Sequence, residues 1–84
     1  MDGLEIDYQA PLSPHRQIAA WLRKRIDAGE FPPGKRLPSE NDIQQLTGVA
    51  ATTVRRAIAL LREQGIVYTV PGRGTYAGQP PAET

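Results

Sequence analysis

The chain has 84 residues, a formal net charge of +1, no cysteine and a single histidine, His15. This length allows one small domain with a limited core. The absence of cysteine excludes disulfides and thiolate metal sites, and one histidine cannot hold a metal alone. The 9 acidic residues form no constellation with a nucleophile or a base. The sequence therefore predicts no enzyme, no catalytic residue, no metal and no cofactor.

The chain carries no membrane signal. Residues 1–5 are acidic and lack the basic and apolar regions of a signal peptide. No apolar run approaches the length that a membrane span requires. We therefore expect a cytoplasmic protein that makes no membrane contact.

A first helix is expected after an N-terminal arm. Residues 1–12 are polar, and we expect them to form a flexible or loosely docked arm. Ser13 followed by Pro14 is typical of an N-cap and the first helical position. Apolar residues then recur at four-residue spacing: Ile18, Leu22 and Ile26. This spacing predicts a helix over 14–28.

A second, shorter helix is expected after a loop rich in proline and glycine. Two prolines and a glycine forbid helix in that loop, and Phe31 and Leu37 are expected to point inward. Ser39 can cap the next helix and pair with Asp42 in a variant of the capping box. This helix is expected to end near Leu46.

A third helix is predicted over 51–64, after the turn Thr47-Gly48-Val49 and before Gly65. One face of it is apolar and is expected to be buried: Val54, Ala57, Ile58 and Leu61. The opposite face is small and basic: Thr52, Arg55, Arg56, Ala59 and Arg62. Two helices joined by a tight glycine turn are typical of a helix-turn-helix.

A β-hairpin is expected after the third helix. Residues 66–70 are β-branched or aromatic and predict a strand, and 75–77 can return as its partner across the turn at 71–74. Residues 78–84 are expected to be a disordered tail or the start of a linker. The predicted fold class is α+β, a winged helix-turn-helix over 13–77 with three helices and a two-stranded wing.

This arrangement favours binding to double-stranded DNA. Thr52 and Thr53 can hydrogen-bond to phosphates or bases, and Arg55 and Arg56 can reach guanine edges or phosphates. Arg73 at the tip of the wing can add positive charge to the minor groove. The alternative is an ordinary helical hairpin with a solvated basic face, followed by a plain hairpin that closes the core.

Two aromatic residues are candidates for stacking on the bases of single-stranded nucleic acid. Trp21 adjoins an apolar helical stripe and Tyr68 lies in the middle of a predicted strand. For both residues we expect core packing. The single phenylalanine also leaves the sequence without an aromatic platform for RNA.

The sequence resembles the DNA-binding domain of the GntR family of bacterial regulators from about Leu12 to Ala77. Several stretches carry the resemblance: Gln17–Ala19, Gly29–Glu40, Leu46–Val49, Thr52–Ala57, Leu61, Gly65–Val67 and Gly72–Tyr76. The resemblance implies a dimer on a palindromic operator, with Ser39 and its neighbours at phosphate, Thr52, Thr53 and Arg55 in the major groove, and Gly72 and Arg73 at the minor groove. The full set of candidate DNA-binding residues is Arg36, Ser39, Asn41, Thr52, Thr53, Arg55, Arg56, Gly72, Arg73 and Gly74.

The sequence departs from the family pattern at several positions. Asn41 stands where family members commonly carry arginine, and Ala50 and Ala51 stand where they often carry serine and then arginine. A missing N-cap serine costs about 1 kcal/mol, and each good bidentate arginine contact to a base contributes about 1–3 kcal/mol. Arg56 replaces a usual acid and can compensate through an added phosphate contact.

The resulting hypothesis is a sequence-specific DNA-binding repressor that acts at the nucleoid. A small-molecule effector is expected only if a C-terminal domain, normal in the family, is missing from this chain. The chain is then either a truncated DNA-binding domain or a small natural protein. The alternative function is a winged-helix module for protein interaction with weak or no DNA binding, which Asn41, Ala50, Ala51 and the near-neutral charge favour.

Overall fold

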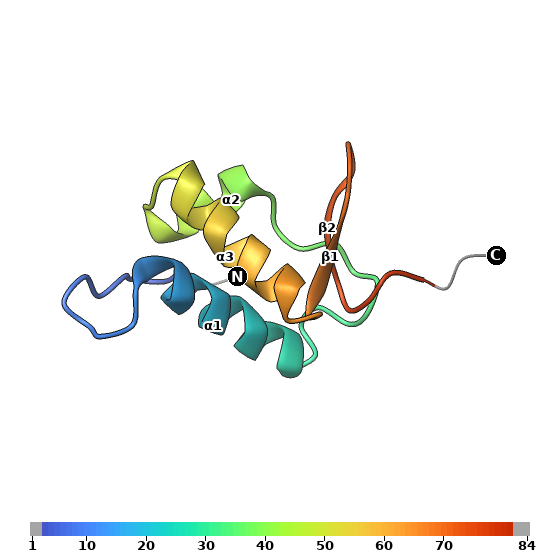
Figure 1. Ribbon diagram of the computed structural model, residues 1–84, viewed down its shortest axis with the longest axis horizontal. Helices are drawn as coiled ribbons and strands as arrows, with labels where there is room; N and C mark the ends of the chain where they lie inside the picture. The colour runs from blue at the N-terminus through green and yellow to red at the C-terminus, as the bar shows by residue number, and fades with distance from the viewer. Residues whose placement is uncertain (1–2, 82–84) are drawn as a thin grey trace.

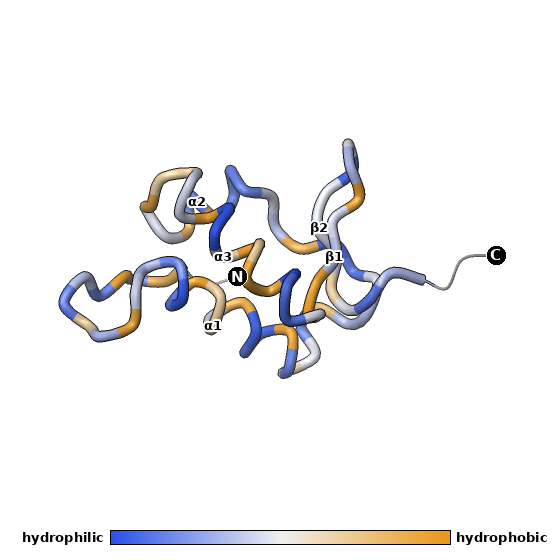
Figure 2. Tube along the Cα trace, in the orientation of Figure 1, coloured by the Kyte–Doolittle hydropathy of each residue, from blue (hydrophilic) through white to orange (hydrophobic). Residues whose placement is uncertain are grey.

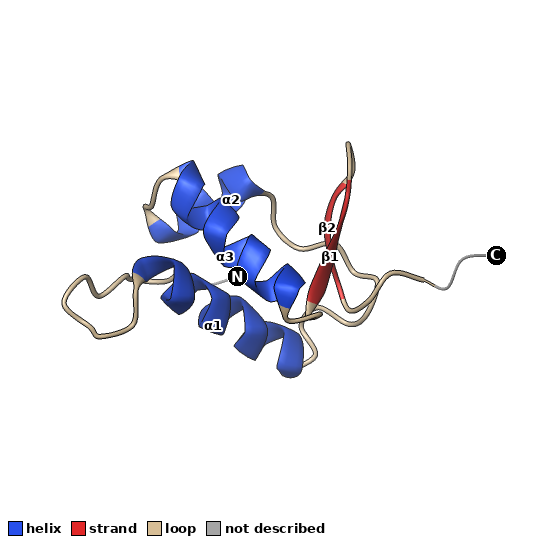
Figure 3. Ribbon diagram, in the orientation of Figure 1, coloured by secondary structure: helices blue, strands red, loops and turns tan. Residues whose placement is uncertain are grey.

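The computed structural model describes residues 3–81, which form three helices followed by a two-stranded hairpin (Figure 1). The elements are α1 (Pro14–Asp27), α2 (Glu40–Thr47), α3 (Ala51–Glu63), β1 (Val67–Val70) and β2 (Gly74–Ala77). Figure 3 shows the helices on one side of the domain and the hairpin standing beside them. This is the predicted α+β winged helix-turn-helix, and the predicted element ends differ by one residue at most.

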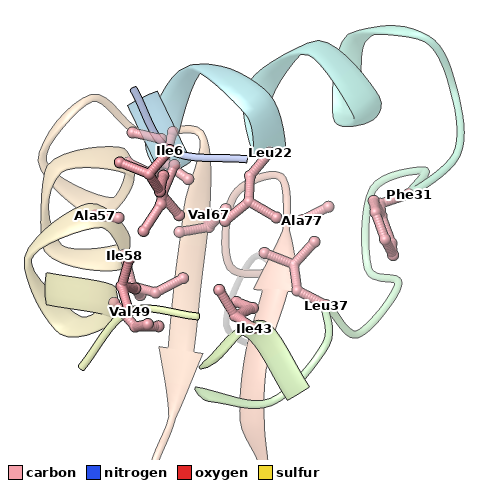
Figure 4. Close-up of a cluster of buried hydrophobic side chains, with 14 residues drawn as sticks. Ile6, Leu22, Phe31, Leu37, Ile43, Val49, Ala57, Ile58, Val67 and Ala77 are labelled. Atoms are coloured by element: carbon pink, nitrogen blue, oxygen red, sulfur yellow. The ribbon is translucent and has the colours of Figure 1, made fainter. Parts of the chain in front are cut away.

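The core lies where α1, α3 and the base of the hairpin meet (Figure 4). Ile18 and Leu22 of α1 and Val54, Ala57 and Leu61 of α3 are almost completely buried. The hydropathy colouring in Figure 2 shows apolar segments of both helices facing the centre of the domain. The predicted apolar face of α3 is therefore confirmed in full, since Ile58 is also buried. Phe31 and Leu37 point inward, as predicted.

Glycines in left-handed backbone conformations end the helices. Gly65 has a φ of +75°, and its N–H donates to the carbonyl oxygen of Arg62 while Ile66 donates to Leu61. This pair of bonds is a Schellman motif, and it confirms Gly65 as the residue that closes α3. Gly48 has a φ of +73° in the turn between α2 and α3, a conformation that a residue with a Cβ rarely adopts.

The hairpin, hereafter the wing (residues 67–77), is antiparallel and pairs Val67 with Ala77 and Val70 with Gly74. The buried pair Val67 and Ala77 anchors its base in the core. The loop before α2 lies along the other edge of β2, where the Leu37 N–H donates to the carbonyl oxygen of Thr75 over 2.8 Å. β2 is thus hydrogen-bonded on both of its edges, to β1 and to the loop before α2.

The N-terminal arm differs from its prediction. Where a flexible or loosely docked segment was expected, Ile6 lies in the core and Leu4 packs against it. Leu4 N–H donates to the carbonyl oxygen of Leu46 over 3.0 Å, at the end of α2. Gln17 holds the next turn, since its amide nitrogen donates to the carbonyl oxygen of Asp7 over 2.7 Å. Burial of Ile6 and these bonds offset the entropy of ordering the arm.

Two smaller expectations also need correction. Ser13 occupies the N-cap position of α1, but its side chain contacts His15 Nδ1 at 3.2 Å and makes no capping bond. Tyr68 does not enter the core, because it stacks on Tyr76 on the outer face of the wing with ring centroids 5.6 Å apart. Trp21 is half-buried and packs against the core as predicted, with Arg25 over its ring.

Within residues 3–81, no helix has both the length and the apolar character that crossing a membrane requires. The predicted tail falls partly in this range, and Gly78 is still bound to the fold through its N–H to the carbonyl oxygen of Ile66. Residues 82–84 of that predicted tail lie outside the described residues.

Candidate nucleic-acid interface

The outward face of α3 is the centre of the candidate interface. Burial of the opposite face turns Thr52, Arg55 and Arg56 toward solvent, while Thr53 is half-buried. Within the described part of the chain, no hydrogen bond or ion pair holds the side chain of Arg56. A helix that presents small polar and arginine side chains at its start has the shape and chemistry for a DNA major groove.

The start of α2 is held by a complete capping box. Ser39 Oγ accepts the backbone N–H of Asp42 over 3.0 Å, and the Asp42 carboxylate accepts the backbone N–H of Ser39 over 3.2 Å. This confirms the predicted pairing. The Ser39 hydroxyl hydrogen is still available to donate to a phosphate oxygen. Asn41 is exposed in the first turn beside it.

An ion pair links the two helices of the helix-turn-helix. Arg55 Nε lies 3.1 Å from Glu40 Oε1, and the side chains are 61% and 47% exposed respectively. At this exposure the pair contributes at most about 1 kcal/mol to stability. It does fix the Arg55 guanidinium on the side of α3 that faces the start of α2. The sequence did not predict this contact.

A groove of about 400 Å³ separates the start of α2 from the wing. It brings together five of the predicted site residues: Arg36, Ser39, Gly72, Arg73 and Gly74. The α3 residues of the predicted site lie outside its lining. Arg55 of α3 is connected to the groove through Glu40, which lines the groove and forms the ion pair with Arg55. In Figure 1 the wing tip and the starts of α2 and α3 lie on the same side of the domain, away from α1.

The wing tip is a tight turn that presents one arginine. Arg73 N–H donates to the carbonyl oxygen of Val70 over 3.0 Å, and Gly72 has a φ of +77° between them. Pro71 followed by a glycine of positive φ is the pattern of a type II turn. No side-chain bond engages Arg73 within residues 3–81, and Arg73 is exposed, as are Pro71 and Gly72 before it.

Gly74 begins β2 directly after this turn, and the Arg36 side chain lies against it. A Cβ atom added at Gly74 would lie 2.9 Å from Arg36 Nε, and the φ of Gly74 is +135°. Glycine at this position therefore lets the Arg36 side chain pass across β2 into the groove. The close approach of Gly74 to Arg36 explains how these two residues, far apart in sequence, line the same groove.

The start of α3 has no side-chain cap. Ala50 holds the N-cap position with φ −71° and ψ 156°, a conformation that suits a capping residue. Its methyl group cannot accept a hydrogen bond. This agrees with the sequence, in which Ala50 replaces the serine common in the family.

A second contact that was not predicted joins α3 to the wing. Arg62 Nη1 donates to Thr69 Oγ1 over 2.9 Å, and Thr69 Oγ1 lies 3.4 Å from Thr75 Oγ1. These residues link the end of α3 to both strands of the wing. The only sequence signal was the position of Arg62 on the outward face of α3, which gives no partner.

Nothing in the described part of the chain forms a metal site, since residues 3–81 contain no group of three or more His, Cys, Asp or Glu side chains that could hold an ion. Their buried residues also include no polar or charged side chain.

Helix-turn-helix, wing and basic outward face together define a DNA-binding winged helix-turn-helix domain of the kind found in transcription regulators. Residues 14–77 match the family described as "Bacterial regulatory proteins, gntR family", and the chain belongs to this family. The predicted family and fold are thereby confirmed. The family consists of transcription regulators and not of enzymes.

Named relatives and solved structures agree with this assignment. The chain is 35% identical over 80 residues to the transcriptional repressor NagR of Bacillus subtilis, covering 95% of this chain and 33% of the relative. It is 45% identical over 62 residues to the repressor MngR of Escherichia coli, covering 74% and 26%. The chain therefore spans about a third or less of these relatives.

The fold matches a solved structure of AraR(DBD) in complex with operator ORX1 with a TM-score of 0.82. The sequences are 31% identical, and the match covers 93% of this chain and 99% of that chain. A GntR family transcriptional regulator from Listeria monocytogenes matches with a TM-score of 0.79 at 32% identity, covering 89% and 64%.

Proposed function

We propose that this chain binds double-stranded DNA in a sequence-specific manner and thereby regulates transcription. α3 enters the major groove, where Thr52, Thr53, Arg55 and Arg56 contact bases and phosphates. The observation that carries the proposal is that the wing tip and the starts of α2 and α3 lie on the same side of the domain, with the groove between α2 and the wing. A duplex lying on this side meets both elements at once.

The remaining site residues have roles at the DNA backbone and the minor groove. Ser39 and Asn41 at the start of α2 donate to phosphates, with Arg36 beside them in the groove. Arg73 enters the minor groove, and Gly72 and Gly74 allow the close approach of the wing. The absence of side-chain partners for Arg73 and Arg56 in residues 3–81 supports these roles.

We further infer that the regulated outcome is repression at a palindromic operator, bound by two copies of the chain. The names of the relatives NagR and MngR support repression, since both are called repressors. Half-sites about one helical turn apart would place two α3 helices in successive major grooves. The place of action is the bacterial nucleoid. An effector molecule would bind to a further domain, as the greater length of the relatives suggests.

The test is selection of binding sites from a random duplex pool, followed by fluorescence anisotropy with the selected site and a scrambled one. We expect the selected site to be at least tenfold tighter, with affinity that falls steeply as salt rises because phosphate contacts release counterions. Equal, weak affinity for both duplexes would contradict the proposal. A stable protein partner found in that case would favour the protein-interaction module.

A further inference from the structure

We propose that the Arg62–Thr69–Thr75 network is a positioning device that sets the angle between α3 and the wing, and that Arg62 therefore acts on DNA affinity without contacting DNA. The proposal rests on the proposed DNA-binding function. Arg62 Nη1 donates to Thr69 Oγ1 over 2.9 Å, and the Thr69 and Thr75 hydroxyl oxygens lie 3.4 Å apart. The guanidinium thus binds β1 directly and is linked to β2 through the Thr69 hydroxyl.

The position of Arg62 on α3 matters for this role. Arg62 follows Arg55 by seven residues, which is close to two full helical turns. The two arginines therefore share the outward face of α3, with Arg62 about 10 Å further along the axis. Arg55 is held toward α2 by Glu40, and Arg62 is held toward the wing. The same helix face is tied at one end to α2 and at the other end to β1.

The strand register directs both threonines toward α3. Thr69 pairs with Thr75, two residues from the buried pair Val67 and Ala77 on each strand. Side chains two residues apart along a strand lie on the same face of a hairpin. The two hydroxyl groups therefore lie on the face of the wing that is buried at its base. Among residues 3–81, the one side chain of α3 hydrogen-bonded to this pair is Arg62, which donates to Thr69.

The tip of the wing needs such a support because it extends beyond the core. Gly72 follows Val67 by five residues, which span about 16 Å when the chain is extended. A rotation of about 10° at the base would then displace Arg73 by about 3 Å. Binding groups must be held within about 0.5 Å of their productive positions. Small changes of the wing angle would therefore remove the minor-groove contact while α3 remained in place.

The hydroxyl bonds supply a way to separate this role from a direct phosphate contact. Thr69→Val removes the acceptor of the Arg62 bond, keeps nearly the same shape and changes no charge. Thr69→Ser keeps the acceptor. Arg62→Met removes the donor and one charge, and Arg23→Met removes one charge from an exposed position on α1. These four variants form two matched pairs.

The measurement is operator affinity against salt concentration, together with the orientation of β1 and β2 relative to α3 from NMR residual dipolar couplings in the free protein. We expect Thr69→Val and Arg62→Met to weaken binding about three- to tenfold each, with the double variant no weaker than Arg62→Met alone. The salt slope should remain that of the unmodified chain, and the couplings should report a changed wing angle. Thr69→Ser and Arg23→Met should bind within about twofold of the unmodified chain.

Two results would overturn the proposal. One is unchanged affinity in Thr69→Val while Arg62→Met weakens binding and lowers the salt slope by about 1, which would make Arg62 a phosphate contact. The other is an unchanged wing angle in both variants. If the unmodified chain bound no operator, the proposed function would fail, and the couplings in the free protein would still decide whether the network sets the angle.

Discussion

The N-cap residues of α2 and α3 have nearly the same backbone conformation, but only the N-cap of α2 has a side chain that caps its helix. Ser39 has φ −68° and ψ 166°, and Ala50 has φ −71° and ψ 156°. Ser39 accepts the N–H of Asp42 and closes a capping box, whereas Ala50 makes no side-chain bond. The difference teaches that α2 is stabilised locally, while α3 depends on its buried face and leaves its first turn exposed toward the proposed DNA.

The burial of the two helices shows the same contrast. Ile43 is the one buried residue of α2, whereas α3 buries Val54, Ala57, Ile58 and Leu61. A short helix with a single buried anchor needs its cap. A longer helix with four buried residues keeps its place without one, because tertiary packing contributes more than a cap does.

The largest expected effect concerns the anchor of α2. Ile43→Ala should lower the free energy of unfolding by about 2–5 kcal/mol, because Ile43 is completely buried and its loss leaves a cavity. Urea denaturation followed by circular dichroism measures this change. Leu12→Ala, at an exposed apolar position, is the control and should cost less than about 0.5 kcal/mol. Similar losses in the two variants would contradict the burial of Ile43.

The next effect concerns the cap itself. Ser39→Ala should lower the free energy of unfolding by about 1 kcal/mol, because the N–H of Asp42 loses its acceptor. Ser13→Ala offers a matched control, since Ser13 has the same position at α1 and no capping bond. Its loss in the same denaturation assay should be clearly smaller. Equal losses of unfolding free energy in the two variants would contradict the difference between the capped start of α2 and the uncapped start of α1.

The reverse change at α3 should stabilise the domain. Ala50→Ser gives an N-cap backbone an acceptor, so we expect a gain of about 1 kcal/mol in the free energy of unfolding. Ala59→Ser within α3 controls for serine in general and should lower stability by a few tenths, about 0.5 kcal/mol. Thermal unfolding of both variants provides the measurement. A melting temperature for Ala50→Ser at or below that of the unmodified chain would show that α3 gains nothing from a cap.

The smallest effect is expected at the link between the two helices. Glu40→Gln should lower the free energy of unfolding by less than about 1 kcal/mol, since its ion pair with Arg55 is exposed to solvent. The loss should shrink at high salt, where such pairs are screened. The control is Glu63→Gln, which removes an acid at the C-terminal end of α3. A loss for Glu40→Gln well above 1 kcal/mol, independent of salt, would mean that the pair is more than a surface contact.

Much of the fold could be predicted because it depends on local patterns. The positions of apolar residues around the helix axis identified the buried face of α3, and the glycine at 65 identified its end. The Ser39 capping box also followed from residues three apart. In each case the deciding contacts join residues that are close in sequence, where helical geometry fixes which groups meet.

The arm and the groove could not be predicted because distant segments decide them. Ile6 lies between two acids in a polar segment, and it is buried because the arm reaches the end of α2 through the Leu4 and Leu46 bond. The groove and the Arg62–Thr69 bond depend on the angle of the wing to the helices. No local pattern in the sequence encodes that angle.

The most direct test of the central claim is the operator affinity of a double variant, Arg55→Ala with Arg73→Ala, compared with Arg23→Ala and Lys24→Ala on α1. Both double variants remove two positive charges. Fluorescence anisotropy on the selected operator should show a loss of at least about 1–3 kcal/mol in binding free energy for the interface pair, and a much smaller loss for the α1 pair. Unchanged affinity in the interface variant, or equal losses in the two, would contradict the assignment of α3 and the wing to the DNA grooves.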